Sequence, residues 1–240
     1  MLRKTYPYYD INNDVQYVIG FGIDITKEKL HELSLAQSLI EKETLLGEIH
    51  HRVKNNLALI DGVVELKKAL EKDKYIVETL SDIQSRIKTV ALVHQKLYQN
   101  ELFSNIDIKD YINELVLYQQ KLFNKQNLET VKFEVAVEDI SFDISKSVSL
   151  GLLLNELVSN SLKYGIINNQ VIINISLVKQ GNSILLTYKD SGKGLQQNIK
   201  ESTTKGFGFK LIQSLIKQFK ASHEIIETNH FEMRVVIPIN

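Results

Sequence analysis

The chain has 240 residues, balances 29 Lys plus Arg against 29 Asp plus Glu, and contains no Cys. The lack of Cys excludes a disulfide scaffold and any Cys-ligated zinc or iron–sulfur site. Hydrophobic residues make up 43% of the chain, which argues against disorder, and the zero net charge argues against a dedicated nucleic-acid partner. No apolar run reaches the ~18 residues of a membrane span. We therefore expect a cytoplasmic chain without a membrane segment.

A strand is predicted near the N-terminus. Residues 15–23, VQYVIGFGI, are β-branched and aromatic, and the turn-forming triplet Asn12-Asn13-Asp14 precedes them. A lone strand cannot form a domain. We therefore expect residues 1–27 to be a strand remnant of another domain followed by a linker.

Residues 28–104 show helical periodicity. Two amphipathic runs with steps of mostly three or four residues flank the charged segment 71–74, which predicts an antiparallel pair of long helices. A second copy would complete a four-helix bundle, so we expect a homodimer through residues 28–104. The apolar positions are Leu46, Ile49, Val53, Leu57, Ile60, Val64 and then Ile76, Leu80, Ile83, Ile87, Val90, Leu97.

Residues 105–240 mix helices with strands. Helices are predicted over 108–123, 145–164 and 207–220, strands over 131–137, 171–179 and 183–189, and a closing hairpin over 223–239. Helices segregated from a largely antiparallel sheet make an α/β sandwich of the α+β class. The predicted organisation is therefore a helical hairpin followed by this sandwich.

The first long helix carries adjacent histidines. At ~100° per residue, His50 lies ~55° from the centre of the apolar stripe and His51 ~155° away from it. An exposed, neutral imidazole in mid-helix has a bare ring nitrogen and is able to act as a nucleophile. Glu48 lies about one turn before His51 and Asn55 one turn after it. The alternative interpretation is a pair of ordinary surface histidines.

Glycine-rich segments and one polar helix face point to a phosphate ligand. The segments 190–194, DSGKG, and 206–210, GFGFK, hold four of the eleven Gly in the chain, and a Gly-rich helix start offers bare N–H groups to phosphate. The stretch 195–205 between them reads as a flap over a ligand. Gly also marks ordinary turns.

Residues 152–164 of the predicted helix over 145–164 carry a polar face that suits a magnesium–phosphate site. That face holds an acid, an amide, an amine and a phenol, and hard oxygen ligands suit magnesium. An ordinary amphipathic helix is the alternative. The residues of the face are Glu156, Asn160, Lys163 and Tyr164.

Together these segments resemble a known family. The stretch 45–57, with HHRVKNN at 50–56, resembles the phosphoacceptor box of two-component sensor histidine kinases of the HWE-like subgroup. Residues 154–165, 190–194 and 206–208 resemble the N, G1 and G2 boxes of the GHKL ATPase fold. Residues 15–26, ending in Asp-Ile-Thr, resemble the end of a PAS sensor domain. The kinase resemblance covers residues 28–240.

The resemblance implies a role for each box. His51 would accept the γ-phosphoryl group of ATP, and Asn160 would bind Mg²⁺ between the phosphates. Glu156 would orient or activate at the γ-phosphate, and Lys163 would contact phosphate. Asp190 would accept a hydrogen bond from the adenine amino group. The other implied nucleotide contacts are Tyr164, Gly192, Gly194, Thr204, Gly206, Phe207 and Gly208.

The sequence departs from the commoner pattern at the phosphoacceptor box. Arg52 stands where many histidine kinases have Glu, so Glu48 is a candidate acid partner for His51, and His50 is a rival acceptor. Asn55 occupies the position that supports phosphatase activity in some of these kinases. Phe207 and Phe209, in and just after the G2 box, stand where smaller aliphatic residues are usual.

We therefore expect an ATP- and Mg²⁺-dependent histidine kinase core that passes its phosphoryl group to the receiver domain of a response regulator. Residues 28–104 would be the dimerisation and phosphotransfer hairpin, and residues 105–240 the catalytic ATP-binding domain. One alternative is a non-catalytic signalling scaffold whose nucleotide site regulates its shape. Another is a GHKL ATPase of the chaperone or repair type.

Overall fold

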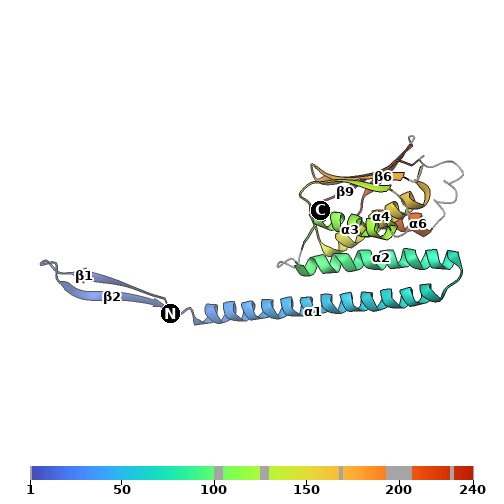
Figure 1. Cartoon of the computed structure of the whole chain (residues 1–240). Helices are drawn as coiled ribbons and strands as arrows, with labels where there is room; N and C mark the ends of the chain where they lie inside the picture. The colour runs from blue at the N-terminus through green and yellow to red at the C-terminus, as the bar shows by residue number, and fades with distance from the viewer. Residues whose placement is uncertain are drawn as a thin grey trace. The chain divides into compact units, whose positions relative to one another are not determined.

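A computed structural model describes residues 2–99, 105–124, 130–167, 170–192, 207–227 and 230–239. The chain divides into two compact units, Met1–Ile49 and His50–Asn240. Figure 1 shows the elements of each unit. No helix among the described residues is both long enough and apolar enough to cross a membrane.

The first unit begins with a hairpin of β1 (Leu2–Tyr9) and β2 (Val15–Ile23), paired antiparallel. β2 has the bounds that its sequence predicts, whereas β1 was missed because Pro7 interrupts its pattern. Pro7 is tolerated because a two-stranded hairpin leaves one side of each strand without a ladder partner. Asp10 closes the turn by accepting hydrogen bonds from the backbone N–H groups of Asn12 and Asp14.

Helix α1 (Thr26–Leu70) starts at the predicted Asp-Ile-Thr linker. The Asp24 carboxylate accepts hydrogen bonds from the Thr26 hydroxyl at 2.6 Å and from the Thr26 backbone N–H at 2.9 Å. These bonds lower the Asp24 pKa, and they satisfy a backbone donor that the first turn of a helix leaves free. The motif therefore has a local physical reason: it starts the helix.

In the second unit, α1 is followed by α2 (Lys74–Gln99) after the loop 71–73. The helices run antiparallel, because Lys68 bonds Gln84 while Asp61, earlier on α1, pairs with Lys88, later on α2. The predicted helical hairpin is therefore confirmed. Many large apolar side chains stay exposed on it: Leu59, Ile60, Val63, Leu66, Leu70, Tyr75, Ile76 and Ile83.

A mixed sheet forms the other layer of this unit. Its strand order is β4-β6-β7-β9-β8, with β4 parallel to β6 and every other pair antiparallel. The bounds are β4 Thr130–Val137, β6 Gln170–Gln180, β7 Ser183–Asp190, β8 Ser222–Glu227 and β9 Phe231–Pro238. The short strands β3 (Ile106–Asp107) and β5 (Ser141–Phe142), which no sequence pattern predicts, pair with each other.

Three helices lie on one face of the sheet (Figure 1): α3 (Ile108–Asn124), α4 (Ile144–Tyr164) and α6 (Phe207–Gln218). Side chains alternate between buried and more accessible along β6 and β7, as expected for a sheet covered on one face. The predicted α+β class, a helical hairpin followed by an α/β sandwich, is confirmed.

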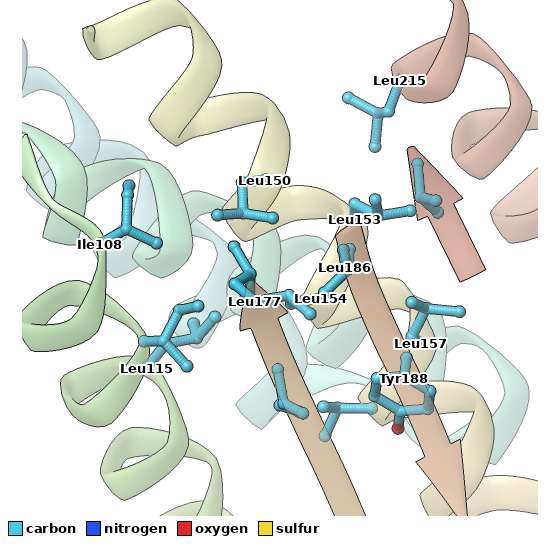
Figure 2. Packing of buried hydrophobic residues seen from close by; sticks show 14 of the residues in the cluster. Ile108, Leu115, Leu150, Leu153, Leu154, Leu157, Leu177, Leu186, Tyr188 and Leu215 are labelled. Atoms are coloured by element: carbon cyan, nitrogen blue, oxygen red, sulfur yellow. The ribbon is translucent and has the colours of Figure 1, made fainter. Parts of the chain in front are cut away.

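The hydrophobic core lies between α4 and the sheet (Figure 2). Leu150, Leu153 and Leu154 of α4 meet Leu177 of β6 and Leu186 of β7, and each is at most 2% exposed. Burying a Leu side chain contributes about 1.5–3 kcal/mol. This packing fixes which face of α4 points away from the sheet.

Gly151 and Tyr111 provide a test of this packing. A Cβ at Gly151 would lie 1.7 Å from the Tyr111 hydroxyl oxygen, and that buried hydroxyl has no hydrogen-bond partner among the described residues. We expect Gly151→Ala to lower the free energy of unfolding by about 1–3 kcal/mol. Tyr111→Phe should leave it unchanged or raise it by about 1 kcal/mol, because an unsatisfied buried group is removed.

Urea unfolding of both variants measures this difference. A Gly151→Ala protein as stable as wild type would contradict the close approach of α4 to Tyr111.

Candidate active site

The two adjacent histidines have opposite environments. His50 is 7% exposed, and its Nδ1 lies 3.1 Å from Nδ1 of His94 on α2. His51 is exposed on the same helix. This agrees with the predicted orientation, and it makes His50 part of the α1–α2 contact. Accessibility therefore favours His51 over the rival His50 as the reactive imidazole.

Glu48 and Asn55 are also exposed on α1. Asn55 follows His51 by one helical turn within the second unit, as predicted. Glu48 belongs to the first unit. Its role as an acid partner stays a prediction from sequence spacing.

Helix α4 positions the predicted magnesium–phosphate face. The helix begins after Asp143, whose carboxylate accepts a hydrogen bond from the Lys146 backbone N–H at 2.8 Å. Asn160 is half-buried, and no hydrogen bond joins its amide to another residue that the structure describes. Tyr164 is 59% exposed at the end of the helix. Asn160 therefore offers an amide oxygen, a hard ligand of the kind that Mg²⁺ takes together with phosphate oxygens.

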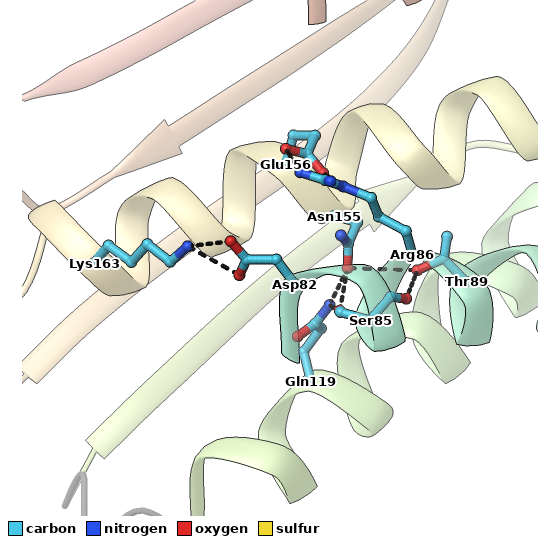
Figure 3. A network of polar contacts seen from close by, with 8 residues as sticks. All are labelled: Asp82, Ser85, Arg86, Thr89, Gln119, Asn155, Glu156 and Lys163. Atoms are coloured by element: carbon cyan, nitrogen blue, oxygen red, sulfur yellow. Dashed lines mark hydrogen bonds and ion pairs between the residues drawn. The ribbon is translucent and has the colours of Figure 1, made fainter. Parts of the chain in front are cut away.

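The other two residues of this face are bound by α2 (Figure 3). Both oxygens of the Glu156 carboxylate accept hydrogen bonds from Arg86, at 2.7 and 3.0 Å, and Glu156 is 4% exposed. Lys163 donates to both oxygens of Asp82, at 2.9 and 2.6 Å. Burial acts to lower the Arg86 pKa, but the bonds and charge of Glu156 outweigh it and the pKa is raised. Arg86 therefore stays charged.

A buried polar cluster lies beside these ion pairs. Asn155 on α4 accepts hydrogen bonds through Oδ1 from the Ser85 hydroxyl and from the Gln119 amide of α3, both at 2.6 Å. Figure 3 shows the three helices meeting at this amide. Because buried polar groups are costly without partners, the cluster fixes the position of α2 on the face of α4.

The end of β7 holds the predicted adenine ligand. Asp190 is 4% exposed; its Oδ2 accepts from the Ser161 hydroxyl at 2.5 Å, and its Oδ1 accepts from the Gly192 backbone N–H at 2.8 Å. The Ser161 hydroxyl also contacts the Tyr188 hydroxyl at 2.8 Å. Burial raises the Asp190 pKa, because desolvation disfavours the charged form.

Two glycines approach each other beside Asp190. A Cβ on Gly192 would lie 2.6 Å from the Gly165 Cα and 2.9 Å from Oδ1 of Asp190. Gly165 also ends α4, donating its backbone N–H to the Ser161 carbonyl at 2.7 Å. A side chain at position 192 would collide with the backbone of Gly165, so this position requires glycine.

The second Gly-rich segment meets the face of α4. A Cβ on Gly208, in the first turn of α6, would lie 2.9 Å from Oε2 of Glu156. The Phe207 ring lies 4.9 Å from the Arg86 guanidinium carbon, an attractive cation–π arrangement. Gly194, Thr204, Gly206 and the predicted flap over 195–205 lie outside the described residues.

Several residues that build this site do not stand out in the sequence. Ser161 is a polar residue on the otherwise apolar, sheet-facing side of α4, and that exception to the pattern was the available signal. Arg86 and Asp82 gave no local signal, because charged residues on a helix usually face solvent. Among the described residues, no three His, Asp or Glu side chains are grouped to hold a metal. The role of Asn160 as a Mg²⁺ ligand stays a prediction.

Residues 48–118 match the HisKA_2 family, whose description is histidine kinase. This segment contains His51, Asn55 and Arg86. It is a histidine kinase segment. The match confirms the resemblance carried by the HHRVKNN box.

Curated histidine kinases are similar to this chain over most of its length. Blue-light-activated histidine kinase 2 of Erythrobacter litoralis (strain HTCC2594) is 19% identical over 217 residues, covering 88% of this chain and 60% of the relative. Sensor histidine kinase PdtaS of Mycobacterium tuberculosis (strain ATCC 25618 / H37Rv) is 21% identical over 222 residues, covering 90% of this chain and 42% of the relative. The chain thus spans about half the length of these relatives.

Solved structures show the same fold. The blue-light activated histidine kinase EL346 of Erythrobacter litoralis has a TM-score of 0.60 at 14% identity, covering 99% of this chain and 70% of that chain. Its histidine kinase domain has a TM-score of 0.58, with coverage of 83% and 94%. At this identity the likeness establishes the arrangement of a helical hairpin and an α/β sandwich.

The contact between His50 and His94 predicts that the stability of the α1–α2 hairpin depends on pH. At 3.1 Å, one Nδ1 donates and the other accepts, so a proton on both is excluded. Burial and the neighbouring His50 charge lower the His94 pKa below 6.5, so the unfolded chain binds the extra proton first. We expect stability to fall as the pH drops below about 6.5.

Thermal unfolding between pH 7.5 and 5.5 measures this dependence. His94→Asn keeps a polar atom near Nδ1 but does not titrate, so the loss on acidification should be smaller than in wild type. The same pH dependence in both proteins would contradict the assignment to this pair.

Proposed function

We propose that the chain is the core of a sensor histidine kinase that phosphorylates His51 from ATP and passes the phosphoryl group to an aspartate of a response-regulator receiver domain. The observation that carries the proposal is the exposure of His51 in the histidine kinase segment while its neighbour His50 is buried. The α/β sandwich that follows provides the nucleotide contacts.

Asp190 is proposed to select adenine. Its buried carboxylate would accept a hydrogen bond from the adenine amino group, next to the close backbone approach of Gly165 and Gly192. Asn160 would hold Mg²⁺ through its amide oxygen, and Lys163 would contact the phosphates. Bound Mg²⁺ would neutralise phosphate charge and so assist phosphoryl transfer.

The transfer itself requires one unprotonated ring nitrogen on His51. That nitrogen attacks the γ-phosphorus, an N–P bond forms, and the P–O bond to the β-phosphate breaks with its electron pair leaving on ADP. The proton on the other ring nitrogen then passes to water or to a carboxylate. In the second step the receiver aspartate attacks the phosphorus, an O–P bond forms, and the N–P bond breaks.

The helical hairpin of α1 and α2 is also proposed to form a homodimer. Ile60, Ile76 and Ile83 are 47%, 39% and 38% exposed on it, and apolar residues repeated along paired helices favour burial against another helical surface. The β1–β2 hairpin of the first unit is proposed to be the end of a PAS-like sensor domain.

Labelled ATP tests the proposed kinase function. We expect the chain to form a phosphoramidate that is labile in acid and stable in base, and His51→Ala should abolish it. His31→Ala, at another exposed histidine of α1, and His50→Gln should both retain the label. Nucleotide binding without any label would favour the signalling scaffold, and ATP hydrolysis unaffected by His51→Ala would favour the chaperone- or repair-type ATPase.

Asp190→Asn tests the adenine contact. Burial raises the Asp190 pKa, so the folded wild-type protein loses stability as the pH rises through that pKa. The Asp190→Asn protein, whose amide stays neutral, should be at least as stable as wild type at pH 7. Loss of a charged acceptor should weaken ATP binding about tenfold or more.

Calorimetric titration with ATP, alongside thermal unfolding, measures both effects. Asp139→Asn, at an exposed position, is the matched control. Unchanged ATP affinity in a folded Asp190→Asn protein would remove Asp190 from the nucleotide site.

A further inference from the structure

Two charged residues of α2 meet two oppositely charged residues of α4. Asp82 and Arg86 lie one helical turn apart on α2, and they pair with Lys163 and Glu156 of α4 (Figure 3). Each pair is bonded through both oxygens of its carboxylate. Each helix carries one acidic and one basic residue, and each residue faces the opposite charge on the other helix. A shift of α2 by one turn would therefore bring like charges together.

Both α4 partners belong to the proposed ATP site, so the inference rests on the proposed function. Glu156 has both oxygens occupied by Arg86, and the Lys163 ammonium is neutralised by Asp82. A carboxylate bound to a guanidinium is not free to orient groups at the γ-phosphate. A triphosphate that needs the Lys163 charge must compete with Asp82 for it.

Helix α6 also approaches the Glu156 carboxylate. Gly208 of α6 approaches Oε2 of Glu156, and the Phe207 ring packs on the Arg86 guanidinium. Arg86 thus contacts both the polar helix face and the start of the second Gly-rich segment. Moving Arg86 would release both at once.

The register of the hairpin places His51 away from this contact. His50, the neighbour of His51, contacts His94 on α2, whereas Glu156 contacts Arg86, eight residues earlier on α2. At 1.5 Å per residue, these levels are about 12 Å apart along the α2 axis. While the ion pairs hold, Glu156 faces α2 about two turns from the level of the phosphoacceptor.

We propose that Asp82 and Arg86 form an electrostatic clamp that holds the ATP site in an inactive register with respect to His51. The clamp opens when α2 and α4 separate or slide, which frees Glu156 and Lys163 for the nucleotide. A buried ion pair gives little net stability compared with apolar packing. The two pairs of opposite charges do favour one register of α2 on α4. A preference for one register is the property that a switch requires.

Two variants open the clamp. Asp82→Asn removes a half-buried charge and leaves no buried ion unpaired, whereas Arg86→Gln leaves the 4% exposed Glu156 without its partner and is the less stable of the two. Lys88→Gln, which pairs with α1 rather than α4, and Glu78→Gln, at an exposed position, are the matched controls on α2. Arg86→Lys keeps the charge but loses the two-point bond to Glu156, so it should open the clamp in part.

Three measurements decide the proposal: amide hydrogen exchange over residues 144–164, ATP affinity, and the initial rate of His51 phosphorylation. We expect Asp82→Asn to raise the affinity and the rate about two- to fivefold, and Arg86→Gln to raise them further if it remains folded. Both variants should increase exchange in α4, and the controls should leave all three measurements at the wild-type level.

Failure of the clamp differs from failure of the proposed function. A wild-type chain that binds ATP and labels His51, with Asp82→Asn giving an unchanged or lower rate, overturns the clamp and leaves the kinase standing. A chain that neither binds ATP nor labels His51 in any variant overturns the proposed function, and with it a clamp on an ATP site, even where hydrogen exchange shows the α2–α4 contact opening.

Discussion

Helix α4 is buried on two opposite sides, and the second unit is arranged around this constraint. One side packs Leu153 and Leu157 onto the sheet, while the other presents Asn155 and Glu156, 2% and 4% exposed, to α2. Polar groups at such depth are costly unless they are bonded. α2 and α3 supply those bonds, so the polar side of α4 determines where the helical hairpin can lie.

The same contacts hold residues of the proposed ATP site in place. An apolar contact between α2 and α4 would allow many sliding positions at similar energy, whereas hydrogen bonds and crossed ion pairs allow few. Breaking a buried pair by removing one partner costs about 3–5 kcal/mol, so the contact between Arg86 and Glu156 favours the register seen here. Residues proposed to handle ATP are thus also residues that hold the hairpin in place.

The sequence predicts where many residues of the candidate site lie, because these positions depend on short local patterns. The orientation of His50 and His51 follows from helical periodicity alone, and their burial agrees with it. Asp190 and Gly192 stand together at a strand end, where a short segment fixes their relation. The alignment of Glu156, Asn160 and Lys163 on one helix face is likewise a property of helical spacing. Ser161 was missed because its hydroxyl finds Asp190 and Tyr188 only when α4 docks on β7.

The sequence by itself determined the helical hairpin, the α+β class and most strand positions, because these depend on the periodic placement of apolar residues. It also determined the exposed histidine, which depends on rotation around one helix. Only the tertiary structure decided that Asp82 and Arg86 reach α4, since residues about 70 and 81 positions apart are brought together by packing. Those contacts depend on how two helices face each other, and no local pattern encodes that facing.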